Sequence, residues 1–356
     1  MKNGLTILLL CLSTLGFAQI GGDAVYEFLD LPVSARANAL GGQLTTVYDE
    51  DAGLGLGNPS LYNASMHQQA VFNFGLMPAS INYGNFAYTH HVSKWNSTLA
   101  AQFQYIDYGT FPLTDETGMQ IGTFKASEVA FGGGIGYRYN ERFSFGANVR
   151  LVSSNFEAYN SFGMSTDIGA SFIDTARNFT ATVVLRNVGF QFSTFGEDNR
   201  ENLPFNAQIG FSKRLRYLPL RLSVIFQHLQ QWDIRFDDPN NTPTTSIFGE
   251  EAAEDSGFTK FVDNLFRHIV FSGELLLGKN DVFQIRFGYN HLRRQELSIT
   301  NLRSLSGFSG GFGIRVKRFQ IDYGFAAYHI AGGLNQFSLR TDIGSFGKNK
   351  RKSKSF

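Results

Sequence analysis

Alternation of large apolar residues with small or polar ones is the sequence feature that most constrains the fold. In residues 129–151, "VAFGGGIGYRYNERFSFGANVRL", apolar side chains recur at every second position on both sides of "YNER". This period predicts two strands joined by a tight turn, with one apolar face and one polar face. A soluble hairpin would bury its aromatic face beneath another layer, so the fold depends on what covers this face.

The rest of the chain repeats this pattern in fourteen predicted strands. Short polar connections such as "SKWN", "YNER" and "GKND" alternate with connections that are mostly longer, including about thirty residues after Trp232. Short turns at one end and long loops at the other are typical of outer-membrane barrels. No amphipathic helix of useful length lies between the segments, so we expect lipid to cover the apolar face. The predicted strands are 66–77, 80–92, 95–113, 119–139, 142–158, 161–174, 178–193, 203–215, 219–233, 268–278, 281–297, 307–318, 319–331 and 334–344.

Composition supports the barrel over a soluble β-sandwich, whose strands also alternate. The chain has 36 Phe, 14 Tyr and 38 Gly in 356 residues, yet its mean hydropathy is only −0.14. Strands with one apolar and one polar face produce such an average. A sandwich gives no reason for unequal loop lengths at its two ends. The sequence therefore predicts an all-β, transmembrane antiparallel β-barrel of about 14 strands over residues 66–344.

The first residues indicate export. Lys2, an apolar run from Leu5 to Phe17 and the small residue Ala18 predict a cleaved signal peptide over residues 1–18. The run is shorter than the roughly 20 residues that a membrane-spanning helix needs. The only cysteine, Cys11, lies inside this signal, so we expect a mature chain without thiols, disulfides or a lipid anchor. Without Lys2, 30 basic residues face 30 acidic ones, and this balance gives no reason to expect a nucleic-acid partner.

Residues 19–65 do not have the pattern of a lipid-facing strand. "PVSARANALGG" ends in Gly41 and Gly42, and the turn-rich "YDEDAGLGLGNPSLY" contains Asn58 and Pro59. A closed wall of about fourteen strands leaves a lumen that needs filling. The sequence predicts that this segment is a plug and that residues 345–356, "SFGKNKRKSKSF", form a basic tail.

Several stretches resemble a known family. "LPVSARANALGG" followed by "DEDAGLGLGNPSLY" resembles the N-terminal signature of FadL-like outer-membrane barrels. Together with "YEFLDLPVSARANALGG", the stretches "INYGNFAYTH", "LPFNAQIGFSKRL" and "LQQWDIRFDDP" are similar to the PorQ branch of these barrels, and the likeness covers nearly the whole mature chain. The resemblance implies an integral outer-membrane protein of the Bacteroidota type IX secretion system, with its loops at the cell surface and both termini in the periplasm.

The resemblance also implies partners and a function. PorQ-like barrels anchor a PorZ-type surface protein in the attachment complex, which fixes exported cargo to the cell surface, and the sortase PorU and the barrel PorV act there too. We therefore expect a non-enzymatic docking barrel without cofactors, in contact with outer-membrane lipids. The alternatives are a FadL-like transporter of hydrophobic small molecules and an outer-membrane esterase or phospholipase. Fold alone does not decide among them.

Motifs that suggest catalysis or metal binding lack the context that such chemistry needs. Ser309 lies in G-x-S-x-G, but its surroundings read as a strand and not as a strand-turn-helix elbow, and Ser345 matches S-x-x-K by chance. His90 and His91 point to opposite faces of a strand, so they cannot share a metal. Asp49, Glu50 and Asp51 lack the spaced ligands of a calcium loop and are predicted to form a solvated acidic turn. We predict no catalytic, cofactor or metal site.

Two further sets of residues carry expectations. Lumen-facing charges of both signs are predicted to neutralise one another, because buried charges need partners; they are Glu128, Arg150, Asp167, Arg221, Arg286, Arg315 and Asp322. In the long connection after Trp232, a short helix is predicted to present one apolar face, where either a surface partner docks or the helix lids the barrel. The residues of that face are Phe258, Phe261, Leu265 and Phe266.

Overall fold

A computed structural model describes residues 24–196, 200–235, 257–297, 304–329 and 332–344. The predicted signal peptide, the basic tail with Ser345 and most of the loop after Trp232 lie outside these residues. No helix in the described ranges is long and apolar enough to cross a membrane.

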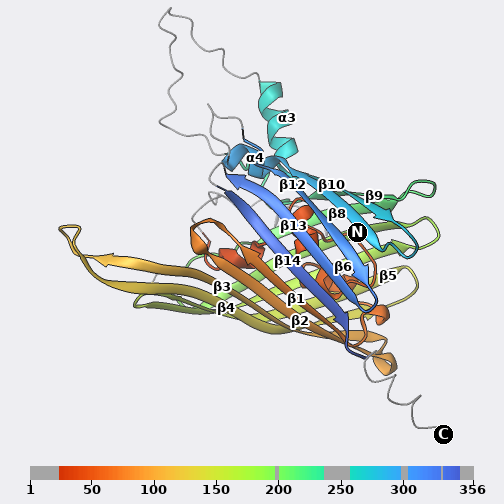
Figure 1. The fold of residues 1–356 in the computed structure, drawn as a ribbon, viewed down its shortest axis with the longest axis horizontal. Helices are drawn as coiled ribbons and strands as arrows, with labels where there is room; N and C mark the ends of the chain where they lie inside the picture. Colours follow the sequence, from red (N-terminus) through yellow and green to blue (C-terminus); the bar gives the residue numbers. More distant parts are fainter. Residues whose placement is uncertain (1–23, 197–199, 236–256, 298–303, 330–331, 345–356) are drawn as a thin grey trace, which may run out of the picture.

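Fourteen antiparallel strands close into one barrel, as predicted (Figure 1). Each strand pairs with its neighbours in sequence, and β1 closes the wall against β14. The strands are β1 Gln69–Leu76, β2 Asn82–Val92, β3 Ser97–Thr114, β4 Gln120–Arg138, β5 Phe143–Phe156, β6 Tyr159–Asp174, β7 Phe179–Ser193, β8 Asn206–Arg214, β9 Leu220–Phe226, β10 Ile269–Leu277, β11 Phe283–Asn290, β12 Phe308–Val316, β13 Phe319–His329 and β14 Gly332–Asp342.

Two predicted strands were too long. The segment 281–297 ends as a strand at Asn290, and His291–Leu297 forms helix α4. The Asn290 side chain accepts a hydrogen bond from the Arg293 amide, which starts the helix in the manner of an N-cap. Strand β9 ends at Phe226, whereas the prediction continued it to residue 233.

The outside of the wall is apolar and the inside is polar. Phe145 and Phe211 are 46% and 41% exposed, while their chain neighbours Ser144 and Ser212 face the interior at 1% and 6%. Neighbouring rings pack along the outer face, as for Phe72 and Phe86, whose centroids are 4.8 Å apart. An apolar band of this extent needs a non-aqueous cover, and lipid provides it.

The plug segment lies inside the barrel (Figure 1). It is made of short turns of helix with little regular structure between them, and nearly all of its apolar side chains are buried. Its elements are η2 Glu27–Asp30, α2 Ala35–Ala39, η3 Ala52–Leu56, η4 Pro59–Leu61 and η5 Ala64–Met66. The lumen is therefore packed by protein over much of its length.

The wall is taller on one side than on the other. β3 and β4 have 18 and 19 residues, whereas β8 to β12 have seven to nine. Beyond their neighbours, β3 and β4 continue as a free two-stranded ribbon, which projects at the left of Figure 1. Above the low side stand α4 and helix α3, Gly257–Arg267. The helical turns η6 Pro78–Ser80 and η7 Ser93–Trp95 complete the described elements.

The two ends of the described chain lie at opposite ends of the barrel. Ala24 forms a parallel bridge with Asn202 in a connection at the long-loop end, while Ile343 after β14 donates to the Gln68 carbonyl at the short-turn end. The prediction put both termini on one side. Residues 1–23 and 345–356, which carry the two termini, lie outside the described part, so that prediction is not tested.

Candidate functional site

The plug helix α2 is docked onto the inner wall by backbone and side-chain hydrogen bonds. Ser34 caps the helix by accepting from the Ala37 amide, and the Ala35 amide donates to Ser338 on β14. The fully buried Asn38 side chain donates to the carbonyls of Gly324 and Leu334. These bonds tie the helix to two neighbouring strands, so individual hydrogen bonds fix its position on the wall.

Gly41 and Gly42 end this helix. Their φ angles are +91° and +94°, a region that residues with a Cβ rarely adopt. The Gly41 amide donates to Ser309 Oγ on β12, and the same Oγ donates to the Ala39 carbonyl. Ser309, the residue of the G-x-S-x-G match, thus holds the plug helix, and it lies within a strand as the sequence indicated.

Asn58 and Pro59 form the second docking point. Asn58 is fully buried, caps η4 by accepting from the Ser60 amide and donates to the Thr45 carbonyl. Ser60 Oγ lies 2.5 Å from Ser171 Oγ on β6. A Cβ at Gly146 on β5 would lie 2.3 Å from the Pro59 carbonyl carbon. Glycine in the wall therefore lets this turn pack directly against backbone.

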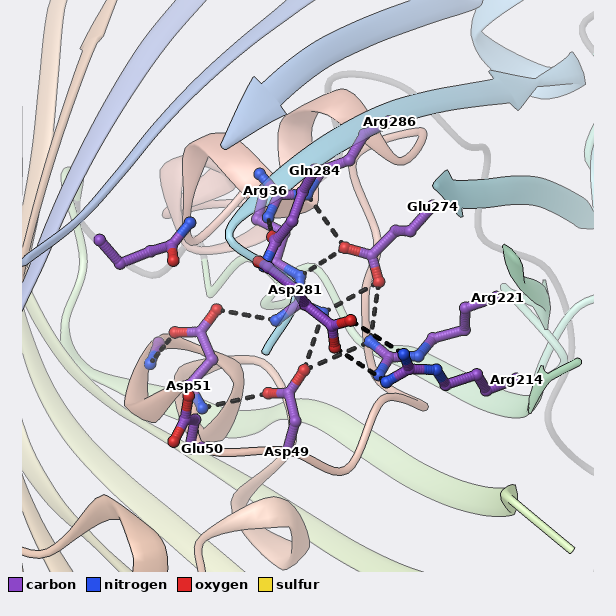
Figure 2. Close-up of polar contacts among 12 residues, drawn as sticks. Arg36, Asp49, Glu50, Asp51, Arg214, Arg221, Glu274, Asp281, Gln284 and Arg286 are labelled. Carbon is purple, nitrogen blue, oxygen red and sulfur yellow. Dashed lines mark hydrogen bonds and ion pairs between the residues drawn. The ribbon is translucent and has the colours of Figure 1, made fainter. Parts of the chain in front are cut away.

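An ion-pair network centred on Arg36 clamps the plug to the wall (Figure 2). Arg36 Nε donates to Glu274 on β10 at 2.8 Å, and its two terminal nitrogens reach Asp49 and Asp51 of the plug at 2.8 and 3.1 Å. Arg221 on β9 bridges Asp49 and Glu274. The cation of the plug thus meets an anion of the wall, and an anion of the plug meets a cation of the wall.

The same network corrects the prediction for residues 49–51. They were expected to form a solvated acidic turn, but each carboxylate pairs with an arginine. Asp51 also pairs with Arg340 on β14, and Glu50 pairs with Arg315 on β12. Because these partners come from separate strands, three consecutive acidic residues fix the plug to much of the wall.

Most of the lumen-facing charges behave as predicted. Arg286 pairs with Glu274 and Asp322, and Arg150 pairs with Asp167 at 2.6 Å. Glu128 is the exception, because it has no ion pair among the described residues. It accepts instead from the Tyr108 hydroxyl. Buried pairs of this kind are destabilising to break, because the remaining charge is left without a partner.

Sequence reasoning missed Arg36 and Glu274, the two central residues. A signal existed for both: Arg36 is the one charge in "PVSARANALGG", and Glu274 is the one charge in "IVFSGELLLG". A lone charge within an apolar or small-residue stretch needs a buried partner. The partner itself could not be read from the sequence, because the two residues are 238 positions apart.

A cavity of about 680 Å³ lies on the short-turn side of this network. Its lining is polar and carries charges of both signs, including Arg214, which pairs with Asp281 at 2.8 Å. Lining residues from the plug include Tyr48, Asp49 and Asn63. Such a lining suits water and polar groups and does not suit a hydrocarbon.

The long-loop end carries the predicted apolar helix face. In α3, Phe258 is 77% exposed, Phe261 50% and Phe266 41%, while Leu265 is partly buried. Trp232, which the sequence reasoning did not include, is 54% exposed and packs on Phe261 with ring centroids 5.5 Å apart. Phe266 packs on Phe271 and His291. The exposed aromatic side chains Trp232, Phe258, Phe261 and Phe266 are named here the α3 face.

Polar contacts hold α3 in place. The Asn264 side chain donates to the Trp232 carbonyl and accepts from the Ile234 amide. Asp263 accepts from Arg267 and lies 3.0 Å from His291 Nε2 of α4. Partial burial opposes its ionisation, but the hydrogen bonds from His291 and Arg267 outweigh burial and lower the pKa of Asp263. The α3 face is thus presented by an anchored helix.

The β3–β4 ribbon has two unequal edges. The Lys125 carbonyl accepts from the Glu157 amide, so by strand alternation the backbone groups of Thr123 also point away from β3. On the other edge Pro112, paired with Thr123, removes the corresponding donor. Ile121 is 64% exposed. Proline therefore protects one edge of the ribbon and leaves the β4 edge open.

His90 and His91, the pair considered in the sequence, lie at the short-turn end. The His90 ring packs on His67 with centroids 4.7 Å apart, and His91 Nδ1 bonds the Thr98 hydroxyl. Within the described ranges no group of three or more His, Cys, Asp or Glu side chains is arranged to hold a metal ion.

The comparisons with known proteins identify the fold. No family model and no curated protein matches the sequence. Among solved structures, the CymD monoaromatic hydrocarbon channel superposes with a TM-score of 0.51 at 11% identity, over 86% of this chain and 95% of that one. The Pseudomonas putida toluene transporter TodX gives 0.50 at 10% identity, over 86% and 96%. The chain therefore shares the barrel fold of these two channels.

Proposed function

We propose that the chain is an outer-membrane docking platform whose long-loop end holds a surface partner. The observation that carries this proposal is the α3 face, a set of exposed aromatic side chains on and beside an anchored helix beyond the barrel rim. Exposed aromatic clusters of this kind mark interaction sites, and Trp and Phe are common anchors of protein interfaces. In this proposal the long-loop end faces the cell surface.

The fixed plug favours a docking platform and argues against an open pore. Arg36, Asp49 and Glu274 link plug and wall through buried ion pairs, and Ser309 and Asn38 add neutral hydrogen bonds. Opening the lumen would require all of these contacts to break together. The contacts instead give the barrel a rigid interior, which suits a scaffold.

The resemblance to the PorQ branch supplies the finer proposal. There the partner is a PorZ-type surface protein within the type IX attachment complex, with PorU and PorV as further members of that complex. The α3 face is where we propose that the partner binds.

A second candidate is transport of hydrophobic small molecules. The fold likeness to CymD and TodX favours it, and the comparisons support it more directly than they support docking. It requires an apolar path past the plug, and the cavity at the short-turn end is polar. The two candidates therefore differ in what the plug must do.

One experiment separates the candidates. Tagged wild-type protein, a Phe258→Ser/Phe261→Ser variant and a Lys260→Ser control are captured from mild detergent, and uptake of a labelled monoaromatic hydrocarbon is measured in the same cells. Docking predicts one surface protein that wild type and control retain and the double variant loses, with uptake equal in all strains and in a deletion strain. Uptake that depends on the chain, with no protein lost by the double variant, would reverse the proposal.

A further inference from the structure

The short-turn end carries a ring of exposed cations that the functions proposed above do not use. These residues belong to the turns or to the adjoining strand ends, and none makes an ion pair with another described residue. They are Lys94, Arg142, Lys213, Arg216, Lys279 and Lys317. We refer to them as the cationic ring.

The acidic residues of the same end do not balance the ring. Asp174 and Asp281 are held by other arginines, Arg177 and Arg214. The exposed Glu141, next to Arg142, offsets only one charge of the ring. The long-loop end differs, since exposed acids such as Asp115, Glu116 and Glu157 occur in its turns. The excess of positive charge is therefore specific to one end of the barrel.

Aromatic side chains place this ring at the edge of the lipid. Trp95, Tyr139 and Tyr217 are 59%, 65% and 90% exposed, and Lys94 and Arg216 are their chain neighbours. The Arg216 guanidinium lies 5.9 Å from the centre of the Tyr217 ring. Exposed Trp and Tyr at the end of an apolar wall mark the membrane–water interface, where lipid headgroups lie.

We propose that the cationic ring binds the phosphate headgroups of anionic phospholipids in the leaflet at the short-turn end. Two observations select this occupant: the positive charge complements the phosphate, and the ring continues directly from the lipid-facing wall. Each Lys or Arg near a membrane surface favours anionic lipid by about fivefold at low salt, and salt weakens the attraction because the charges are exposed.

The two tryptophans make this proposal testable. Trp95 lies beside the ring, and Trp232 lies at the other end of the barrel. A Trp232→Phe variant in phosphatidylcholine vesicles with a minor fraction of phosphatidylglycerol reports only from Trp95. Quenching of its fluorescence is measured twice. Brominated acyl chains are carried by phosphatidylglycerol in one measurement and by phosphatidylcholine in the other, at the same mole fraction of brominated lipid.

The proposal predicts several-fold stronger quenching by brominated phosphatidylglycerol, and a return to equal quenching in 1 M salt. Adding Lys94→Gln and Arg142→Gln removes the preference, whereas Lys125→Gln and Lys260→Gln at the long-loop end leave it. The Trp95→Phe variant, which reports from Trp232, shows no preference. Inorganic phosphate at millimolar concentration does not displace the lipid.

Equal quenching of Trp95 by both lipids at low salt overturns the proposal, and so does a preference that survives neutralisation of Lys94 and Arg142. The salt titration uses only the Trp232→Phe protein, so the test stands even where the charge variants fail to assemble. If both lipids quench Trp95 equally, an acidic protein surface becomes the next candidate ligand of the cationic ring.

Discussion

Replacing Arg36 with Met should loosen the plug without opening the wall. Arg36 belongs to the plug and supplies three ion pairs, to Asp49, Asp51 and Glu274, but it takes no part in strand pairing. Removing one partner of a buried ion pair costs about 3 to 5 kcal/mol. The lower value applies here, because Asp49 and Glu274 keep Arg221 and Asp51 keeps Arg340.

A loss of about 3 kcal/mol of plug stability raises the equilibrium constant for opening of the plug by roughly a hundredfold. Amide hydrogen exchange of the Asn38 and Gly42 amides, which bond within the helix and its cap, measures this opening in detergent or vesicles. Heat-modifiable migration on a denaturing gel shows that the barrel itself is intact. Conductance in planar bilayers reports whether the loosened plug lets ions pass.

The matched control is Arg315→Met. Its pair with Glu50 is partly exposed, and exposed pairs contribute only about 0 to 1 kcal/mol. The reasoning predicts little change in exchange for this variant. Equal exchange in wild type and Arg36→Met would refute the account, because the network would then not hold the plug.

The remaining predictions concern the wall, the ribbon and the outer helices. Phe211→Arg should reduce the assembled, heat-modifiable form because a charge on the lipid face costs about 2 to 4 kcal/mol at the bilayer centre, whereas Ser212→Arg on the lumen face should reduce it less. A larger loss for Ser212→Arg would mean that the faces are reversed. Thr123→Pro should leave the ribbon intact because that amide points away from β3, whereas Gly122→Pro should expose the ribbon to protease; equal cleavage would contradict the edge assignment. The α3–α4 contact should be stable above the usual Asp pKa of about 4 and be lost as pH falls through the lowered pKa of Asp263. Trp232 fluorescence in a Trp95→Phe background measures this loss, and an unchanged acid transition in Asp263→Asn would disprove the assignment.

The sequence predicted the barrel well because a strand's two faces are a local property. The alternation of Phe145 and Phe211 with Ser144 and Ser212 can be read without knowing any partner strand. The predicted strand failed at 291–297, where "HLRRQEL" has no alternation and follows an Asn that can cap a helix. Attention to that cap would have ended the strand at the correct residue.

The clamp could be predicted only in part because it depends on closure of the barrel. Arg286 and Asp322 were expected to find partners, and both did. That Asp49 would meet Arg36 and Arg221 depends on where the plug enters the lumen, which no local pattern specifies. Similarly, Ser309 was excluded as a nucleophile from its strand context, but its bonds to Ala39 and Gly41 required the folded chain.

Locking the plug tests the central claim, that the chain works with its plug fixed. Ser60 of the plug and Ser171 of β6 have hydroxyl oxygens 2.5 Å apart, and the only native cysteine lies in the predicted signal peptide. A Ser60→Cys/Ser171→Cys variant can therefore form one disulfide between plug and wall, with each single variant as a control. The account predicts that cells with the double variant retain the surface partner as wild-type cells do, both when the disulfide has formed and after a reductant has broken it. A loss of function in the oxidised double variant that a reductant restores would contradict the account, because the plug would then have to move.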